Sequence, residues 1–355
     1  GFYTPAEPFP VMKVSRILAK KDAIYQATVV GKPPLEDKVM GLGTERVFLP
    51  LFQAITPDVI DYKMPENGVF HNLILAKIHS HYPAHATQIM HAFWGVGQMS
   101  FVKHAIFVGQ NAPKLDDYGA LVPYILNRFE ASKLYISEGI CDQLDHASPN
   151  ACFGGKAALD ATSEKECSEK LEILSDEALN ELFSSEISLL ALRQFYADTS
   201  TPIVCVLLDK KELVKKSFER LLKFAKHFKI IVFLDSHNRL QNPYMLVWRV
   251  VNNIDAKRDI FFGKDFINSS KNLANFKAKG ENLKQNLANS SEKSTNSNEN
   301  LAHCIGIDAT AKGELEKHPR KWALQVDCTQ KVIENLIKRK LIDKDSALFD
   351  KFELF

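Results

Sequence analysis

The chain repeats one stretch, which opens on Ala105-Ile-Phe-Val-Gly109, continues as Ala120-Leu-Val-Pro-Tyr-Ile-Leu-Asn-Arg-Phe-Glu-Ala131 and closes on Asp160-Ala-Thr162. The repeat opens on Ile230-Ile-Val-Phe-Leu-Asp235 and closes on Asp308-Ala-Thr310. The short apolar runs are typical of strands that are covered on both faces, and the longer run has the apolar spacing of one helical face. Each stretch therefore predicts a strand, a helix and a returning strand.

Matching residues of the two stretches keep a constant offset. Leu115 and Leu240 are 125 residues apart, and so are Asn127 and Asn252. A constant offset across a whole unit is the mark of an internal duplication. Strands that alternate with helices favour a largely parallel sheet. We therefore expect two related α/β units, of which the second is a degenerate copy of the first.

Composition argues against several classes of protein. The chain has 355 residues, a formal net charge of +2, 45% hydrophobic residues and 25% charged residues. It has room for two cores, and its charge gives no reason to expect nucleic acid or a membrane surface as a partner. No apolar run is long enough to cross a bilayer, and no signal peptide opens the chain. Six cysteines without a Cys-x-x-Cys pair predict reduced thiols in a cytoplasmic protein.

The sequence is expected to divide into four parts. Alternating residues at 11–17 and 23–30 predict a β-hairpin that ends an antiparallel domain. The segment 268–300 is rich in Asn, Ser, Lys and Glu, which predicts a disordered insert whose deletion leaves the melting temperature nearly unchanged. The four parts are residues 1–43 with the hairpin and a crossing loop, residues 44–163 with the first α/β unit, residues 164–190 with an acidic helical linker, and residues 191–355 with the second unit.

Further elements are expected around these stretches. The glycines at 41 and 43 are assigned to the crossing loop, and Thr44 is expected to cap the helix that follows. Strands are predicted at 59–62, 72–78 and 202–208, and helices at 44–55, 209–229 and 327–341.

The histidines His81, His85 and His91 suggest a metal site. His81 and His85 have the spacing of a helical ligand pair, but Pro83 lies between them and disfavours a helix there. The run also contains no Asp, Glu or Cys that would complete a ligand set. The sequence therefore favours a loop that leads from a strand to a helix, and we predict no metal ligand in the chain.

The segment Gly154-Gly-Lys156 has two interpretations. Two glycines expose N–H groups and the lysine adds a positive charge, which suits an anion site. The segment lacks the upstream glycine and the following Ser or Thr of a P-loop, so a structural turn with a surface lysine is an equal alternative. The second stretch has Cys304 in place of the lysine, so the second unit does not repeat any function of Lys156.

Five motifs follow one another along the first half of the chain. They are Ile24-Tyr-Gln-Ala-Thr-Val-Val-Gly-Lys-Pro-Pro34, Glu45-Arg-Val-Phe-Leu-Pro50, Tyr82-Pro-Ala-His-Ala86, Ala147-Ser-Pro149, and Gly155-Lys156 with Leu159-Asp-Ala-Thr162. In this order they are similar to motifs of the UbiD family of decarboxylases, over about residues 1–163. The repeat, with Arg320 and Trp322, resembles the C-terminal end of the same family, and the elongated tail is similar to its menaquinone-biosynthesis branch.

The resemblance implies that residues 1–43 end a split β-barrel. It implies a carboxy-lyase that acts on an aromatic hydroxy acid in menaquinone or ubiquinone biosynthesis. It also implies prenylated FMN with Mn²⁺ or Mg²⁺ and K⁺, a flavin prenyltransferase that supplies the cofactor, and a homo-oligomer. This chemistry is consistent, because loss of CO₂ leaves charge on a ring carbon, so a cofactor must take up electrons and an acid must protonate that carbon.

The resemblance also implies where the reactive groups lie. Gly1-Phe-Tyr3 resembles residues that follow the acidic motif of the family, so the catalytic residues are expected upstream of Gly1 and none within this chain. Lys156 is a candidate for cofactor binding. The chain alone is expected to be inactive and to bind no cofactor tightly. Rough alignment places four residues along the substrate pocket: Met40, Gly41, Ile140 and Cys141.

A second class of function stays open at this point. The chain is also compatible with an assembly or oligomerisation module that has no catalytic activity. A nucleotide-binding α/β domain is a weaker alternative, because no Gly-x-Gly-x-x-Gly follows any predicted strand.

Overall fold

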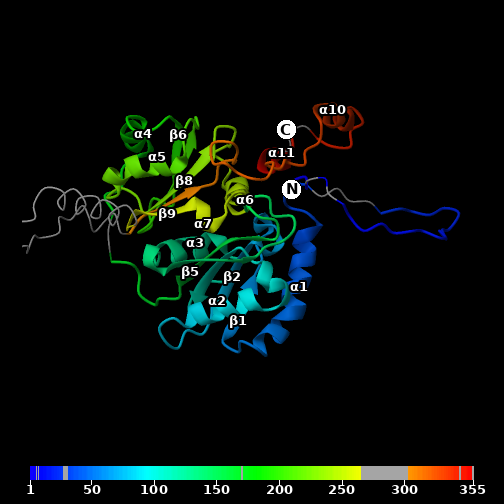
Figure 1. Cartoon of the computed structure of the whole chain (residues 1–355), viewed down its shortest axis with the longest axis horizontal. Coiled ribbons are helices and arrows are strands. Elements are labelled where there is room, and N and C mark those ends of the chain that lie inside the picture. The colour runs from blue at the N-terminus through cyan, green and yellow to red at the C-terminus, as the bar shows by residue number, and fades with distance from the viewer. Residues whose placement is uncertain are drawn as a thin grey trace, which may run out of the picture.

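The computed structural model describes residues 1–4, 6, 8–26, 31–168, 171–264, 303–343 and 345–353. It contains two five-stranded sheets with helices around them, which confirms the predicted α/β class (Figure 1). The predicted insert at 268–300 lies outside the described residues.

The first unit is built on a sheet with the strand order β1-β2-β3-β5-β4. Its three inner strands are parallel, and β1 and β4 run antiparallel at the two edges. The strands are β1 Val59–Lys63, β2 Leu73–Ile78, β3 His104–Gly109, β4 Leu134–Ile140 and β5 Phe153–Ala161. The helices are α1 Glu36–Gln53, α2 His85–Gly95 and α3 Tyr118–Leu126, with short 3-10 helices η1 Glu66–Gly68, η2 Phe70–Asn72, η3 Gly97–Phe101 and η4 Ala131–Lys133.

The second unit repeats this arrangement with the strand order β6-β7-β8-β10-β9. Again the inner strands are parallel and the edge strands β6 and β9 are antiparallel. Both sheets therefore have the same strand order and directions, whereas their descent from a duplication stays a prediction. The strands are β6 Leu189–Phe195, β7 Ile203–Leu208, β8 Ile230–Asp235, β9 Ile260–Phe262 and β10 Ile305–Asp308, and the helices are α4 Asp176–Ser184, α5 Val214–Leu221, η5 Leu222–Phe224, α6 Pro243–Asn253 and α7 Ala256–Asp259.

Equivalent polar residues cap equivalent helices in the two units. Asp117 caps α3, because its Oδ1 accepts a hydrogen bond from the N–H of Ala120 at 3.2 Å. Asn242, which lies 125 residues later, caps α6 by accepting from the N–H of Met245 at 3.2 Å. Short polar side chains stabilise a helix start in this way because the first N–H groups have no partner inside the helix.

The segment before the first unit differs from the predicted hairpin. The described residues 8–26 form no strand, so the predicted end of a split β-barrel is not confirmed. Val11 and Ile24 are 95% and 93% exposed, because these apolar side chains find no packing partner within the described residues. Phe2 does form a β-bridge, but its partner is Gln325. Gln325 belongs to the segment between β10 and residue 353, which is called the tail below.

Helix α1 begins at Glu36 rather than at the predicted position 44. Glu36 and Asp37 favour the earlier start, because negative charge in the first turn stabilises a helix N-terminus. Gly41 lies inside the helix, where a Cβ would come within 3.3 Å of the Phe70 ring. The predicted crossing loop is therefore helical, and its glycine allows a close approach to an aromatic side chain.

Three long predicted helices are helical only in part. The predicted linker helix at 164–190 contains α4, which Ser175 caps by accepting from the N–H of Ala178 at 3.3 Å. Its end is the edge strand β6, because these residues pair with β7. The predicted helix at 209–229 contains α5 and η5, and the predicted tail helix contains α10 Gln330–Lys338 and is followed by α11 Ala347–Lys351.

The two units share one apolar core. A single buried cluster joins Val108 and Leu126 of the first unit to Val232 and Leu246 of the second. Figure 1 shows α3 and α7 between the two sheets, where they cover the facing sides of both. Burial of apolar surface is the main favourable contribution to folding, so the shared cluster holds the units together as one body.

Candidate functional site

The four residues predicted to line a substrate pocket lie in two separate places. Met40 and Gly41 belong to α1, which packs against β1, whereas Ile140 ends β4 and Cys141 follows it. Because β1 and β4 are the two edges of the first sheet, the pairs lie at opposite edges. Met40 and Ile140 are 56% and 46% exposed, and Cys141 is buried. The chain does not bring the four together, and their contact with a substrate stays a prediction.

Lys156 lies in β5 and points its ammonium group into the protein. The residue is 2% exposed, and its Nζ donates to the carbonyl oxygens of Ser100 at 2.6 Å and Val102 at 2.8 Å. Burial lowers the pKa of Lys156 to about 8. The alternative of a surface lysine in a turn is therefore wrong. Cofactor binding by Lys156 stays a prediction, and it requires the ammonium group to exchange these carbonyl partners.

Gly154 and Gly155 also belong to β5, so the predicted glycine loop is a strand. The N–H of Gly155 donates to Oδ2 of Asp255 at 2.7 Å. A Cβ on Gly155 would overlap the Asp255 carboxylate, and one on Gly154 would overlap Oγ of Ser148. Glycine is needed at both positions because these side chains approach the backbone closely. The N–H predicted to bind an anion thus binds a carboxylate of the second unit.

A buried ion pair lies beside this contact. Nζ of Lys103 donates to Oδ1 of Asp145 at 2.7 Å and to the carbonyl oxygen of Ile254 at 2.8 Å. Burial alone would raise the pKa of Asp145, but the charge of Lys103 and the hydrogen bonds from Lys103 and Ser148 outweigh it and lower the pKa to about 2. The Asp145 carboxylate is therefore charged at neutral pH, and Lys103 joins the first unit to the end of α6.

Two buried histidines make further contacts with α6. Nε2 of His104 is 3.2 Å from the carbonyl oxygen of Val251, and Nε2 of His146 is 3.2 Å from Oδ1 of Asn253. Burial lowers the pKa of His104 to about 3 and the pKa of His146 to about 4. Both imidazoles are therefore neutral at pH 7 and act as hydrogen-bonding groups between the units.

The tail covers the same junction. Nη1 of Arg320 donates to the carbonyl oxygens of Asp145 at 2.8 Å and Ser148 at 3.1 Å. The ring of Trp322 contacts His146 edge to face, with centroids 4.7 Å apart. The two tail residues singled out by sequence thus contact the loop that carries the motif Ala147-Ser-Pro149.

The motif that closes both stretches forms the same turn in each unit. Oδ1 of Asp160 accepts from the N–H of Thr162 at 3.0 Å, and Oδ1 of Asp308 accepts from the N–H of Thr310 at 3.0 Å. The threonine hydroxyl also donates to this carboxylate in both units. The motif therefore has a structural role at the end of β5 and of β10.

The histidine run adopts the predicted loop before α2. His81 and His85 both contact Asp58, with Nε2 to carboxylate distances of 3.0 Å and 3.3 Å. Sequence reasoning missed Asp58 because it lies far from the run. Within the described ranges, no group of three His, Cys, Asp or Glu side chains is arranged to hold a metal ion. None of the helices described there is both long enough and apolar enough to cross a bilayer.

Sequence reasoning also missed Lys103, Asp145 and Asp255. The available signal was a lysine directly before a buried strand, because such a lysine needs a buried partner. The sequence does not show which carboxylate that partner is. Together these side chains and the buried histidines form a polar junction that fixes the first unit against α6 and α7.

Two family models match the chain. Residues 38–161 match the C-terminal domain of 3-octaprenyl-4-hydroxybenzoate carboxy-lyase. Residues 1–33 match the Rift-related domain of the same carboxy-lyase. The first match covers all of α1 except its first two residues and the whole first sheet, and the second lies before α1.

Curated relatives are longer than this chain. An uncharacterized protein of Helicobacter pylori strain J99 is 48% identical over 357 residues, which cover 100% of this chain and 52% of that protein. Uncharacterized proteins of Aquifex aeolicus and Archaeoglobus fulgidus are 42% and 37% identical over 164 residues, which cover 46% of this chain and 34% of each relative. The chain thus spans about half the length of the H. pylori relative.

Solved structures of decarboxylases are similar over smaller shares. The UbiD-class enzyme HmfF from Pelotomaculum thermopropionicum, in complex with FMN, is 21% identical, covers 40% of this chain and 32% of its own, and gives a TM-score of 0.31. Vanillic acid decarboxylase from Sedimentibacter hydroxybenzoicus is 16% identical and gives a TM-score of 0.34, and the match covers 43% of this chain and 35% of that enzyme. The 3,4-dihydroxybenzoic acid decarboxylase from Klebsiella pneumoniae is 18% identical and gives a TM-score of 0.31, and the match covers 40% of this chain and 33% of that enzyme.

Proposed function

We propose that this chain is part of a UbiD-family carboxy-lyase that removes CO₂ from an aromatic hydroxy acid in menaquinone or ubiquinone biosynthesis. The observation that carries the proposal is the match of residues 1–33 and 38–161 to two domains of one carboxy-lyase, which supports the UbiD family. Because the chain spans about half of its H. pylori relative, the activity is proposed for a protein of that greater length.

The proposed cofactor of the intact protein is prenylated FMN with Mn²⁺ or Mg²⁺ and K⁺, supplied through a flavin prenyltransferase. When bound, this flavin takes up the electrons that the departing CO₂ leaves on the ring. In this structure the ammonium group of Lys156 and the N–H of Gly155 already have partners, so Lys156 stays a candidate only if it exchanges them for an FMN phosphate. We therefore place the remaining cofactor ligands and the catalytic acid outside this chain. Met40, Gly41, Ile140 and Cys141 are proposed to meet the substrate in the intact assembly.

The test compares this chain with the intact protein after co-expression with a flavin prenyltransferase. The assays are flavin absorbance of the purified protein and CO₂ release from hydroxynaphthoate and hydroxybenzoate. We expect flavin and turnover for the intact protein and neither for the chain alone. Stoichiometric flavin on the chain alone would show that its binding groups are misplaced. An intact, flavin-loaded protein without turnover on any aromatic hydroxy acid would overturn the reaction itself.

An assembly module is the second candidate, and helix α1 favours it. Apolar side chains on this helix point to solvent, among them Val39, Val47 and Leu51. In Figure 1 the helix lies along the outside of the first unit. Contiguous exposed apolar side chains mark interaction surfaces. In this interpretation the chain contributes contacts within a homo-oligomer and no chemistry.

Sedimentation velocity tests whether α1 is an oligomer interface, and the turnover assay above separates the two candidates. The double variant Val47→Glu with Leu51→Glu places two charges on the apolar row, and we expect it to lower the oligomeric state. Leu144→Glu is the matched control, because this residue is exposed in the first unit but lies away from α1. An oligomer that survives the double variant would rule out α1 as its interface.

A further inference from the structure

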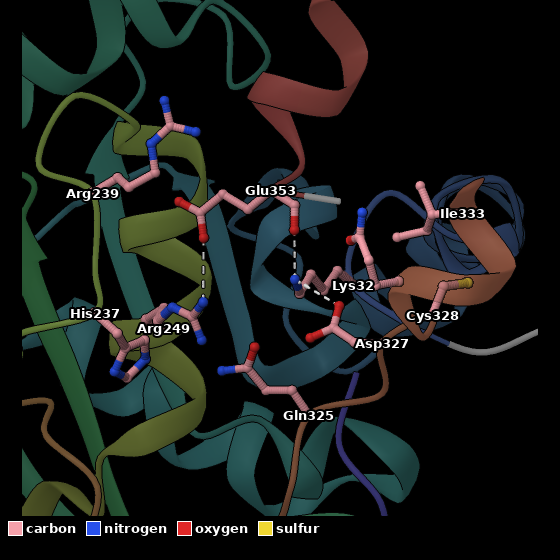
Figure 2. Close-up of a pocket in the computed structure, with 10 residues that line it drawn as sticks. Lys32, His237, Arg239, Arg249, Gln325, Asp327, Cys328, Ile333 and Glu353 are labelled. Carbon is pink, nitrogen blue, oxygen red and sulfur yellow. Dashed lines mark hydrogen bonds and ion pairs between the residues drawn. The ribbon is translucent and has the colours of Figure 1, made fainter. Parts of the chain in front are cut away.

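A pocket of about 360 Å³ opens beside the carboxyl end of β8. His237 and Arg239 line it from the loop after this strand, Arg249 lines it from α6, and Lys32 and Asp327 come from segments distant in sequence (Figure 2). The crevice beyond the carboxyl ends of parallel strands is where α/β sheets bind ligands. Apart from Lys32, its lining residues come from the second unit, and none of them is among the side chains of the polar junction described above.

Arg249 is a buried cation at this pocket. Its side chain is 5% exposed, and Nη2 contacts Oε2 of Glu353 at 3.2 Å. Nε and Nη1 of Arg249 have no hydrogen-bond partner within the part of the chain that the structure describes. A guanidinium group carries five donors in a planar fork that matches a carboxylate or a phosphate. Burial of such a group with unused donors is costly, so the site is suited to a second oxyanion contact.

The tail supplies the present anionic partners of this pocket. Besides its contact with Arg249, Glu353 accepts from Nζ of Lys32 through its backbone carbonyl at 2.6 Å. Oδ1 of Asp350 lies 2.7 Å from Nη2 of Arg239. Figure 2 shows Glu353 reaching between Arg249 and Lys32. Asp350 and Glu353 therefore pair with Arg239 and Arg249, whereas Nζ of Lys32 lies 2.7 Å from Oδ1 of Asp327.

The tail is held here by side chains near the start of α6. Nδ2 of Asn242 donates to the carbonyl oxygen of Lys351 at 2.8 Å. The ring of Phe352 packs against the ring of Tyr244, with centroids 5.4 Å apart. Helix α11 itself has only five residues, and a helix of this length has little stability of its own. A ligand that competes for Arg249 therefore displaces a short segment rather than a packed domain.

We propose that this pocket binds a small anion with a carboxylate or phosphate group, that Arg249 is its main binding residue, and that the Glu353 carboxylate occupies the site in this structure. The tail thereby competes with the ligand for the guanidinium group. The proposal goes beyond the decarboxylation, because the pocket is lined mainly by residues outside the two ranges that match the carboxy-lyase domains.

Isothermal titration calorimetry with the full chain tests the site, with inorganic phosphate and succinate as separate probes. The variant Asp350→Asn with Glu353→Gln removes the carboxylates that pair with Arg239 and Arg249 and leaves Asp327, the partner of Lys32, in place. The apparent affinity is the intrinsic affinity multiplied by the fraction of molecules in which the tail leaves the site free. The variant should raise this fraction, so we expect it to bind one of the probes at least about tenfold more tightly than the parent chain. The probe that gains identifies a phosphate or a carboxylate ligand. Equal affinities in the parent and the tail variant, or no binding in either, would overturn the proposal.

Variants of Arg249 separate ligand binding from folding. Added to the tail variant, Arg249→Gln is expected to abolish the gain, and Arg249→Lys to keep the charge but lose most of it, because lysine has no planar fork. Far-UV circular dichroism melts report whether each variant is folded. Glu172→Gln is the matched control, because it removes an exposed carboxylate paired with Lys226 and lies away from the pocket. Undiminished binding in folded Arg249 variants would assign the ligand to other residues and overturn the proposal.

Discussion

Lys103 and Asp145 form a buried ion pair at the junction of the two units, and their pairing carries a stability prediction. Lys103→Met leaves the Asp145 carboxylate without its ammonium partner. Breaking one side of a buried ion pair costs about 3–5 kcal/mol, because the remaining charge stays desolvated. Urea unfolding should show this loss as a lower midpoint. Glu172→Gln at an exposed pair should leave the midpoint unchanged, and a similarly small change for Lys103→Met would contradict the importance of the pair.

The buried histidines predict a loss of stability on acidification. In the unfolded chain a histidine has a pKa of about 6.5, whereas burial lowers the pKa of His104 to about 3 and that of His146 to about 4. A lowered folded-state pKa means that the stability is complete above about pH 6.5 and is lost as the pH falls toward these values. Each histidine then contributes a slope of up to about 1.4 kcal/mol per pH unit.

The measurement is the free energy of unfolding between pH 7 and pH 4. His146→Gln should flatten the slope and retain a hydrogen-bonding side chain toward Asn253. An unchanged slope would mean that this imidazole is protonated in the folded protein. Asp145 acts at lower pH, because its pKa of about 2 places its own loss between about pH 4 and pH 2.

Gly155 and Gly43 form a matched pair that tests whether a side chain packs too closely against the glycine to admit a Cβ atom. Gly155→Ala places a Cβ on the Asp255 carboxylate, so we expect a loss of about 1–3 kcal/mol and a displaced α7. Gly43→Ala lies inside α1 with open space around the added atom, and should stabilise by about 0.5–1 kcal/mol. Thermal melts of both variants check the opposite signs. A harmless Gly155→Ala would show that α7 does not need this contact.

Single residues show where sequence reasoning stops. The charge of Lys156 and the flexibility of two glycines were visible, but burial of the lysine and the strand conformation of the glycines depend on the neighbouring β4 and η3. Asp58 could not be connected with His81 and His85, because antiparallel pairing of β1 with β2 brings them together. Contacts of this kind arise from tertiary structure, which a spacing pattern does not contain.

Among the elements, buried strands were the easiest to predict. The predicted strands 202–208 and 230–234 closely match β7 and β8, because a short continuous apolar run between polar loops is typical of a buried strand. The predicted linker helix at 164–190 runs into the first two residues of β6, and no strand is predicted for the rest of β6, since an edge strand with one exposed face has weaker patterning. The predicted helix at 44–55 starts too late, because the glycines at 41 and 43 are typical of a loop. In the structure both lie inside α1, and the Phe70 ring packs against Gly41.

The equivalent caps of α3 and α6 predict a matched pair of effects. Asn242→Ala removes the acceptor for the N–H of Met245, and Asp117→Ala removes the acceptor for the N–H of Ala120. Each change should cost about 1 kcal/mol in urea unfolding. Only the Asn242 variant should also speed limited proteolysis of the tail, because its side chain holds the backbone of Lys351. Equal proteolysis of the two variants would show that the tail is held by other contacts.

At the scale of the whole molecule, the shared core predicts cooperative unfolding. Leu126→Ala and Leu234→Ala remove buried side chains from different units but from one cluster, and each should cost about 2–5 kcal/mol. Both should lower the same single transition, followed in parallel by far-UV circular dichroism and tryptophan fluorescence. Two separated transitions would show that the units unfold independently.

The sequence pattern does not predict how the two units pack against each other. The constant offset predicts two similar units, and the observed strand orders agree with this. The offset relates Asn127 to Asn252, yet across the junction Lys103 contacts the carbonyl oxygen of Ile254 and Gly155 contacts Asp255. These partners have no sequence relation, so only the folded arrangement reveals them.

The strand order has a consequence for how the protein is made. In each sheet the strand synthesised last, β5 or β10, lies between two strands that were made earlier. While the ribosome adds the residues between β9 and β10, the nascent chain therefore displays the unpaired edge of β8 and an edge strand that has no neighbour to join. Open edges attract other strands, so this interval is the one in which the growing polypeptide most needs a chaperone. Release of Ile305–Asp308 from the exit tunnel ends the exposure, because that short strand closes the second sheet in a single step.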